Sequence, residues 1–145
     1  MVERIKISAD NLNVWFGSIH ALKSVNLKVY EKEILGVIGP SNSGKSSFLR
    51  CLNRMNDLHP KFKMEGTLTI DDVNIFERID VNALRKKVGM VFALPMPLPL
   101  SISENITYGP QRHGVRDKKK LIEIVETTLK AAYLLKASSQ LEIAT

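Results

Sequence analysis

The chain has 145 residues, 44% of them hydrophobic, and a formal net charge of +6 at pH 7. This length suits one domain, and the apolar fraction excludes a wholly disordered protein. No apolar run approaches the ~18 residues of a membrane span, and the N-terminus lacks the apolar core of a signal peptide. The sequence therefore predicts a cytoplasmic protein. Its basic residues are spread along the chain rather than clustered, so we expect no nucleic-acid partner.

Strand patterns dominate the first part of the sequence. Apolar residues begin one strand between Ile5 and Val14, and apolar and polar residues alternate over Val25–Val29 and Thr67–Ile70. Such alternation is typical of antiparallel strands with one face in water. Two continuous apolar runs, Ile34–Ile38 and Val88–Phe92, instead predict strands that are buried on both faces.

Four helices are predicted from apolar periodicity and from capping residues. The first runs from Lys45 to Met55 and carries the lone cysteine, Cys51, on its apolar stripe, so we expect a packed thiol. Capping residues begin the other three. Asp80 precedes a short helix that ends at Lys87, Ser101 and Glu104 form a capping box before a helix that ends at Gly109-Pro110, and Asp117 precedes a long helix.

Three prolines occupy alternate positions in the segment between residues 93 and 100. Proline lacks a backbone N–H and fixes φ near −65°. This segment is therefore predicted to be extended and excluded from a central sheet ladder.

One motif carries recognisable chemistry, the pattern G-x-x-x-x-G-K-S. Its residues are Gly39, Pro40, Ser41, Asn42, Ser43, Gly44, Lys45 and Ser46. The glycines allow the loop to curl, and its N–H groups, with those of the following helix, then point at phosphate oxygens. Lys45 reaches the β- and γ-phosphates and Ser46 offers its hydroxyl to Mg²⁺. The motif predicts binding of a nucleoside triphosphate.

A P-loop ATPase also needs a carboxylate for Mg²⁺ and a residue that aligns the attacking water. Asp71 and Asp72, which follow the strand pattern Leu68–Ile70, are the only acidic candidates at the end of an apolar run. The alternation of that strand favours a half-exposed turn instead of a central metal site.

With these motifs in hand, the sequence resembles the first half of the nucleotide-binding domain of ABC transporters. Trp15-Phe16-Gly17 resembles the adenine-stacking segment of that family, and Val88–Phe92 is similar to the strand that enters its Q-loop. Residues 48–58 and Tyr108-Gly109-Pro110 look like the ATPases of phosphate importers.

This resemblance implies an α/β fold of the P-loop NTPase class. Residues 1–145 would form the N-terminal portion of the domain, with an incomplete RecA-like core and an antiparallel β subdomain. Residues 93–100 would be a Q-loop-like segment, and residues 101–145 part of the helical subdomain.

The resemblance also implies the cofactors and the residues that hold them. ATP and Mg²⁺ are the expected cofactors, with Phe16 stacked on adenine and Trp15 as the alternative. Ser46 would be the metal ligand. The residues expected at the phosphates are Gly39, Ser41, Asn42, Ser43, Gly44, Lys45, Ser46 and Ser47.

Two departures from the family pattern bear on hydrolysis. Ala93 occupies the position of the Q-loop glutamine, and the sequence contains no signature motif, Walker B aspartate, catalytic glutamate or switch histidine. The resemblance therefore implies that the chain does not hydrolyse ATP by itself.

The function expected from the sequence is that of the ATP-binding component of an importer, for inorganic phosphate in the first instance. It would pair head to tail with a second ATP-binding subunit and lie on the inner face of the membrane through permease subunits. The alternatives are an importer of amino acids or another small solute, a non-catalytic nucleotide-binding module, and a small P-loop kinase. The kinase is disfavoured because the strands precede the P-loop and no arginine-rich lid is visible.

Overall fold

The computed structural model describes residues 4–132 and divides the chain into two compact units. The first unit extends to Val91, and the second begins at Phe92. Among the described residues, no helix is long and apolar enough to cross a membrane.

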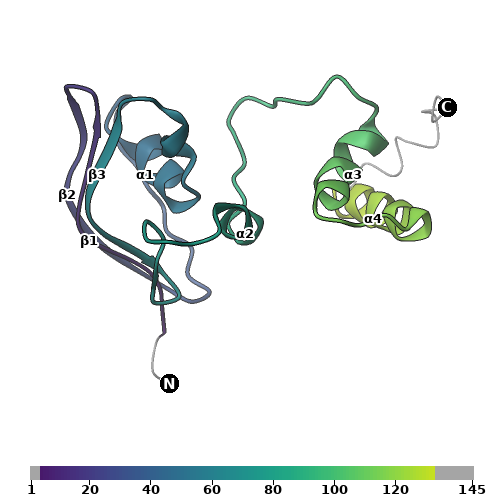
Figure 1. The fold of residues 1–145 in the computed structure, drawn as a ribbon, viewed down its shortest axis with the longest axis horizontal. Helices are drawn as coiled ribbons and strands as arrows, with labels where there is room; N and C mark the ends of the chain where they lie inside the picture. The colour runs from purple at the N-terminus through teal and green to yellow at the C-terminus, as the bar shows by residue number, and fades with distance from the viewer. Residues whose placement is uncertain (1–3, 133–145) are drawn as a thin grey trace. The chain divides into compact units, whose positions relative to one another are not determined.

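A four-stranded antiparallel sheet forms the frame of the first unit (Figure 1). The strand order is β2-β1-β3-β4. The strands are β1 (Ile5–Phe16), β2 (Ile19–Tyr30), β3 (Phe62–Ile70) and β4 (Val73–Asn74). The alternating patterns in the sequence thus lie on antiparallel strands, as predicted.

Strands β1 and β3 bend where their register shifts between Asp10 and Asn13. Gly66 has φ of 91°, and a Cβ there would lie 2.2 Å from the carbonyl oxygen of Asn11. Only glycine permits so close an approach of two backbones. The bend lets the strands curve around helix α1 (Lys45–Leu52), as Figure 1 shows.

Helix α1 supplies the helical side of the core. Phe48 and Cys51 are buried in one cluster with Leu12, Val14 and Leu68 of the sheet. The predicted packed thiol is confirmed, because Cys51 is fully buried and burial raises the pKa of its thiol to about 11.

The first helix ends earlier than predicted, at Leu52 rather than Met55. Arg54 takes the left-handed conformation, with φ of 57°, and a short 3-10 turn, η1 (Met55–Leu58), follows. Arg85 of helix α2 (Val81–Lys87) donates from its guanidinium to the carbonyl oxygens of Asn53 and Arg54. Arg85 therefore binds the two carbonyl oxygens that immediately follow α1.

The structure contradicts the two strands that were predicted to be buried. Residues 34–38 and 88–92 form no strand, and Ile34 is 97% exposed while Val91 is 98% exposed. A strand forms only where neighbouring chain completes its hydrogen-bond ladder. Residues 4–132 provide no such neighbour for either run, so the predicted RecA-like core strands are absent from this part of the chain.

Two helices make up the described part of the second unit, α3 (Ile102–Arg112) and α4 (Lys118–Ala131). The predicted capping box is present, because Ser101 N–H donates to Glu104 Oε2 at 2.9 Å and Glu104 N–H donates to Ser101 Oγ at 3.2 Å. Asp117 caps α4 as predicted, by accepting from the N–H of Lys119. The predicted helical subdomain extends to residue 145, and its last residues lie outside the described ones.

The predicted stop of α3 at Gly109-Pro110 is wrong. The helix continues to Arg112, and Gly114, with φ of 92°, follows its end. Pro110 lies in the last turn of α3. Its missing N–H removes one backbone hydrogen bond of the helix, and few helical residues follow it, so the helix can tolerate the loss. The left-handed glycine beyond the C-cap is the stop that the geometry requires.

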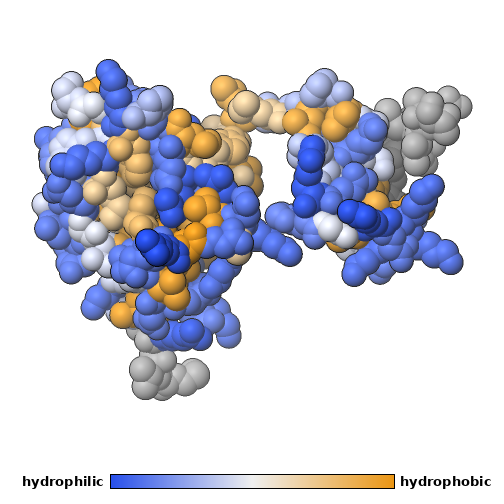
Figure 2. All heavy atoms as spheres, viewed as in Figure 1, coloured by the Kyte–Doolittle hydropathy of each residue, from blue (hydrophilic) through white to orange (hydrophobic). Residues whose placement is uncertain are grey.

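The proline segment between α2 and α3 forms no strand, as predicted. Leu94 and Met96 are 77% and 82% exposed, and Figure 2 shows the hydrophobic surface along this part of the chain. Its last residues are held by Asn105 of α3, which accepts from Leu98 N–H and donates to the carbonyl oxygens of Leu98 and Leu100.

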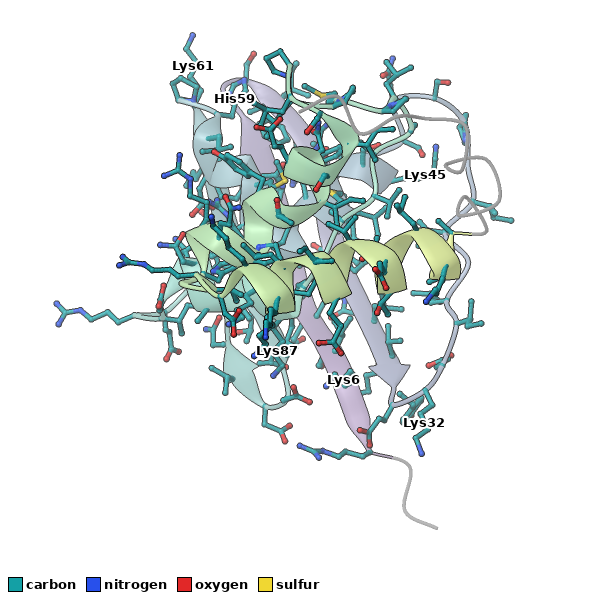
Figure 3. All side chains as sticks on the ribbon, turned by 90° about the vertical axis from the view of Figure 1, so that its right-hand side faces the viewer. Lys6, Lys32, Lys45, His59, Lys61 and Lys87 are labelled. Carbon is teal, nitrogen blue, oxygen red and sulfur yellow. The ribbon has the colours of Figure 1, made fainter. Side chains whose placement is uncertain are left out.

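An ionic cluster surrounds Asp71 in the turn between β3 and β4. Lys6 of β1 donates to its carboxylate at 2.9 Å, and Lys87 of α2 forms a second ion pair with it (Figure 3). The hydrogen bonds from Lys87 and Lys6 lower the pKa of Asp71 to about 2. The cluster thereby ties β1 and α2 to the same turn.

We expect these ion pairs to make the stability of the first unit depend on pH in the acid range. The folded-state pKa of Asp71 is depressed, so its contribution is complete above the unfolded value of about 4 and is lost as the pH falls toward 2. Thermal melting should show Asp71→Asn below wild type at pH 7, with the gap closing by pH 2. The exposed Asp10→Asn is the control, and a gap for Asp71→Asn that persists unchanged at pH 2 would contradict the assignment.

Candidate functional site

The glycine-rich loop curls tightly against the start of α1. Gly44 and Asn42 both take positive φ, of 93° and 62°. The Lys45 ammonium lies over the loop and donates to the carbonyl oxygen of Gly39 at 2.7 Å and to Ser43 Oγ at 3.2 Å. These contacts place one positive charge at the mouth of the loop.

The N-terminus of α1 is arranged to bind an anion. Gly44 is the N-cap, no side chain caps the helix, and the first turn carries no acidic residue. The first N–H groups of a helix have no partner within the helix, and the helix dipole favours negative charge there. A phosphate group satisfies both requirements.

A pocket with a volume of about 960 Å³ opens beside this helix start. That volume is within the usual range for small-molecule sites. Strands β1 and β2 form one wall, and the loop and α1 form the other. The lining residues are Phe16, Ile19, His20, Ala21, Leu22, Lys23, Val25, Asn42, Ser43, Gly44, Lys45, Ser46 and Ser47. Among residues 4–132, two lysines and no carboxylate line the pocket, which suits an anionic ligand.

Phe16 and Trp15 point to opposite faces of β1, because side chains alternate along a strand. Phe16 lines the pocket. Trp15 does not line the pocket and stacks on the lining residue His20, with ring centroids 4.3 Å apart, while the Lys63 ammonium lies 5.2 Å from the Trp15 ring centroid. Of the two aromatic residues proposed for base stacking, the geometry favours Phe16.

The other predicted site residues divide into those that reach the pocket and those that do not. Gly39 and Ser41 belong to the loop but do not line the pocket. Ala93 lies in the second unit, at the start of the proline segment. Asp71 is engaged by lysines and does not line the pocket. Within residues 4–132, no three His, Cys, Asp or Glu side chains form a group that could hold a metal ion.

This arrangement fits a nucleotide bound along the pocket. The α1 N-terminus and Lys45 would receive the phosphates, and the Phe16 ring, which lines the same pocket, would stack on the base. The Ser46 hydroxyl is one of several side-chain oxygens in the lining, with those of Asn42, Ser43 and Ser47, that suit Mg²⁺, which prefers oxygen ligands and keeps several waters. Among the described residues, no carboxylate lines this pocket.

Sequence reasoning missed two residues next to this site, Asn56 and His59. Asn56 is buried and bonds to the backbone of α1, and the His59 ring contacts Phe16. A polar residue directly after an apolar helix stripe could have marked Asn56 as a residue with a specific partner. Because α1 ends early, however, Asn56 lies on a turn, and helical periodicity does not predict the contacts of a turn.

Gly44 has a packing constraint that yields a prediction. A Cβ at this position would lie 2.6 Å from the carbonyl oxygen of Ala21 and 2.8 Å from Leu22 Cδ2, and φ is left-handed. We expect Gly44→Ala to lower the free energy of unfolding of the first unit by at least about 1 kcal/mol. Urea denaturation followed by circular dichroism measures this. Gly36→Ala, where a Cβ meets nothing within 4 Å, is the matched control, and equal stabilities of the two variants would contradict the close approach.

Comparison with known proteins gives one family. The family model described as "ABC transporter" matches residues 22–142, which include the glycine-rich loop and α1 and begin after Phe16. ATP-binding domains of this family bind ATP, generally with Mg²⁺. Because the match covers most of the sequence, the chain belongs to the ABC transporter family.

Proposed function

We propose that this chain is the ATP-binding component of an importer, with inorganic phosphate as the transported solute. The main support for ATP binding is that Lys45, Ser46 and Phe16 line one pocket. The start of α1, which no side chain caps, faces the same pocket. The solute rests on weaker support, the resemblance of residues 48–58 and of Tyr108-Gly109-Pro110 to phosphate-importer ATPases.

In this proposal each part of the pocket has one task. The N–H groups at the start of α1 and the Lys45 ammonium bind the β- and γ-phosphates. Asn42, Ser43, Gly44 and Ser47 shape the cradle, and the Ser46 hydroxyl contributes to Mg²⁺ binding. Phe16 stacks on the base, and aromatic stacking tolerates any base unless polar groups also read its edge.

The proposed partners follow from the family. ATP-binding domains of ABC transporters generally work with transmembrane subunits, so permease subunits and a second ATP-binding subunit are proposed here. This arrangement would place the protein on the inner face of the membrane.

A second candidate function is a nucleotide-binding module that does not hydrolyse ATP. Ala93 favours it, because alanine has no polar group to orient water or to contact Mg²⁺. The lining of the pocket also lacks a carboxylate. Loss of one such orienting group lowers the rate of a reaction by roughly a hundredfold or more, by analogy with deletion of an oxyanion-hole donor.

Nucleotide binding should depend on Lys45. Hydrogen bonds that involve a charged group contribute about 1.5–3 kcal/mol, so Lys45→Ala should weaken Mg-ATP binding roughly tenfold or more. Titration calorimetry measures the dissociation constants. Lys86→Ala, an exposed lysine on α2, should bind as wild type does. Equal affinities of wild type and Lys45→Ala would refute the assignment of the loop.

Uptake measurements distinguish the proposed importer from its alternatives. In cells from which the gene for this chain is deleted, uptake of radiolabelled inorganic phosphate should fall and should be restored by the wild-type gene but not by Lys45→Ala. Uptake of labelled amino acids should not change. A defect in amino-acid uptake alone would favour the other importer class, and unchanged uptake of both would favour the non-hydrolysing module.

A further inference from the structure

A short segment links Phe16 to the first turn of helix α1 through direct contacts. It comprises the turn η1 and His59, and we refer to residues 55–59 as the bracket. One end of the bracket is bonded to helix α1, which carries the phosphate-binding loop, and the other end contacts Phe16.

Asn56 joins the bracket to α1. Its side chain is only 3% exposed, and its Nδ2 donates to the carbonyl oxygen of Ser47 at 2.8 Å and to Cys51 Sγ at 3.1 Å. Ser47 belongs to the first turn of α1 and lines the pocket. A buried amide that lost these partners would leave polar groups unsatisfied, which is costly, so this attachment is specific.

His59 joins the bracket to the aromatic end. The backbone N–H of His59 donates to the carbonyl oxygen of Asn56 at 2.9 Å, which makes the two residues part of one turn. Its ring meets the Phe16 ring edge-on, with centroids 5.0 Å apart and an interplanar angle of 76°. The ring orientation is fixed because Nδ1 accepts from the N–H of Lys61 at 3.2 Å (Figure 3).

We propose that Asn56 and His59 are positioning residues that set the separation between the Phe16 ring and the phosphate-binding loop. The proposal rests on the proposed function, in which Phe16 stacks on the base. A ligand that touches both ends of a pocket gains affinity only when the ends are held at the spacing of the ligand. The bracket would therefore favour a complete nucleotide over a ligand that contacts the phosphate end alone.

The test compares two probes, Mg-ATP and Mg-tripolyphosphate, by titration calorimetry. Tripolyphosphate has the phosphates but no base. We expect His59→Ala to bind Mg-ATP about three- to tenfold more weakly than wild type, because the Phe16 ring is no longer held in place before binding, and to bind tripolyphosphate within about twofold of wild type. His59→Phe restores a ring edge beside Phe16 and should recover most of the affinity for Mg-ATP.

The companion variant Asn56→Ala should also weaken binding of Mg-ATP. Because both residues act through one bracket, the double variant should lose less than the product of the two single losses. Asn56 is buried, so thermal melting must show that the Asn56→Ala variant is folded. His59 is exposed, so we expect His59→Ala to fold as wild type does. The exposed residues Asn82 and His113 supply matched controls, Asn82→Ala and His113→Ala, which should bind both probes as wild type does.

Two results would overturn the bracket. In the first, His59→Ala binds Mg-ATP as wild type does. In the second, it loses the same factor for both probes, which would make His59 a general support of the loop. Neither result affects the proposed function, which stands or falls on whether Mg-ATP binding depends on Lys45.

Discussion

The packing of α1 against the curved sheet is the interaction on which the first unit depends. Leu12, Val14, Leu68 and Cys51 are completely buried there, and Phe48 is nearly so. Full burial of a side chain of this size contributes about 1.5–3 kcal/mol relative to exposure. The same contact fixes the start of α1 beside strand β2, so the burial that stabilises the unit also positions the helix start that lines the pocket.

The two ends of the pocket differ in how they are built. The part formed by the glycine-rich loop depends on backbone geometry, which the left-handed Gly44 and its close approach to Ala21 define. The aromatic end depends on side chains from three segments, in which Phe16 lies between His59 and Phe62. Mutations at the first end should therefore act through conformation, and those at the second through packing.

Local patterns predicted what local physics determines. The glycine-rich loop, the capping residues Asp80, Ser101 and Asp117, and the alternating strands are all where the sequence placed them. The caps depend on hydrogen bonds between residues close in sequence. The strands depend on the alternation of solvent-exposed and buried side chains.

Long-range features could not be predicted in this way. The run at Ile34–Ile38 has strand propensity, but a strand also needs a partner, and no periodicity in a sequence reveals whether one is present. The turn that follows the early end of α1 is bonded by Arg85, which is more than thirty residues away in sequence. The contact of His59 with Phe16 could not be predicted either, because it forms only when the fold brings the turn after η1 next to the end of β1.

The alternating prolines have a consequence for solubility. Leu94 and Met96 expose apolar side chains on an extended segment, and such a segment could otherwise add to the edge of another molecule's sheet. Because Pro95, Pro97 and Pro99 lack N–H groups, the chain offers few of the donors that intermolecular strand pairing requires. The segment can therefore keep apolar groups at the surface with a low tendency to seed aggregates.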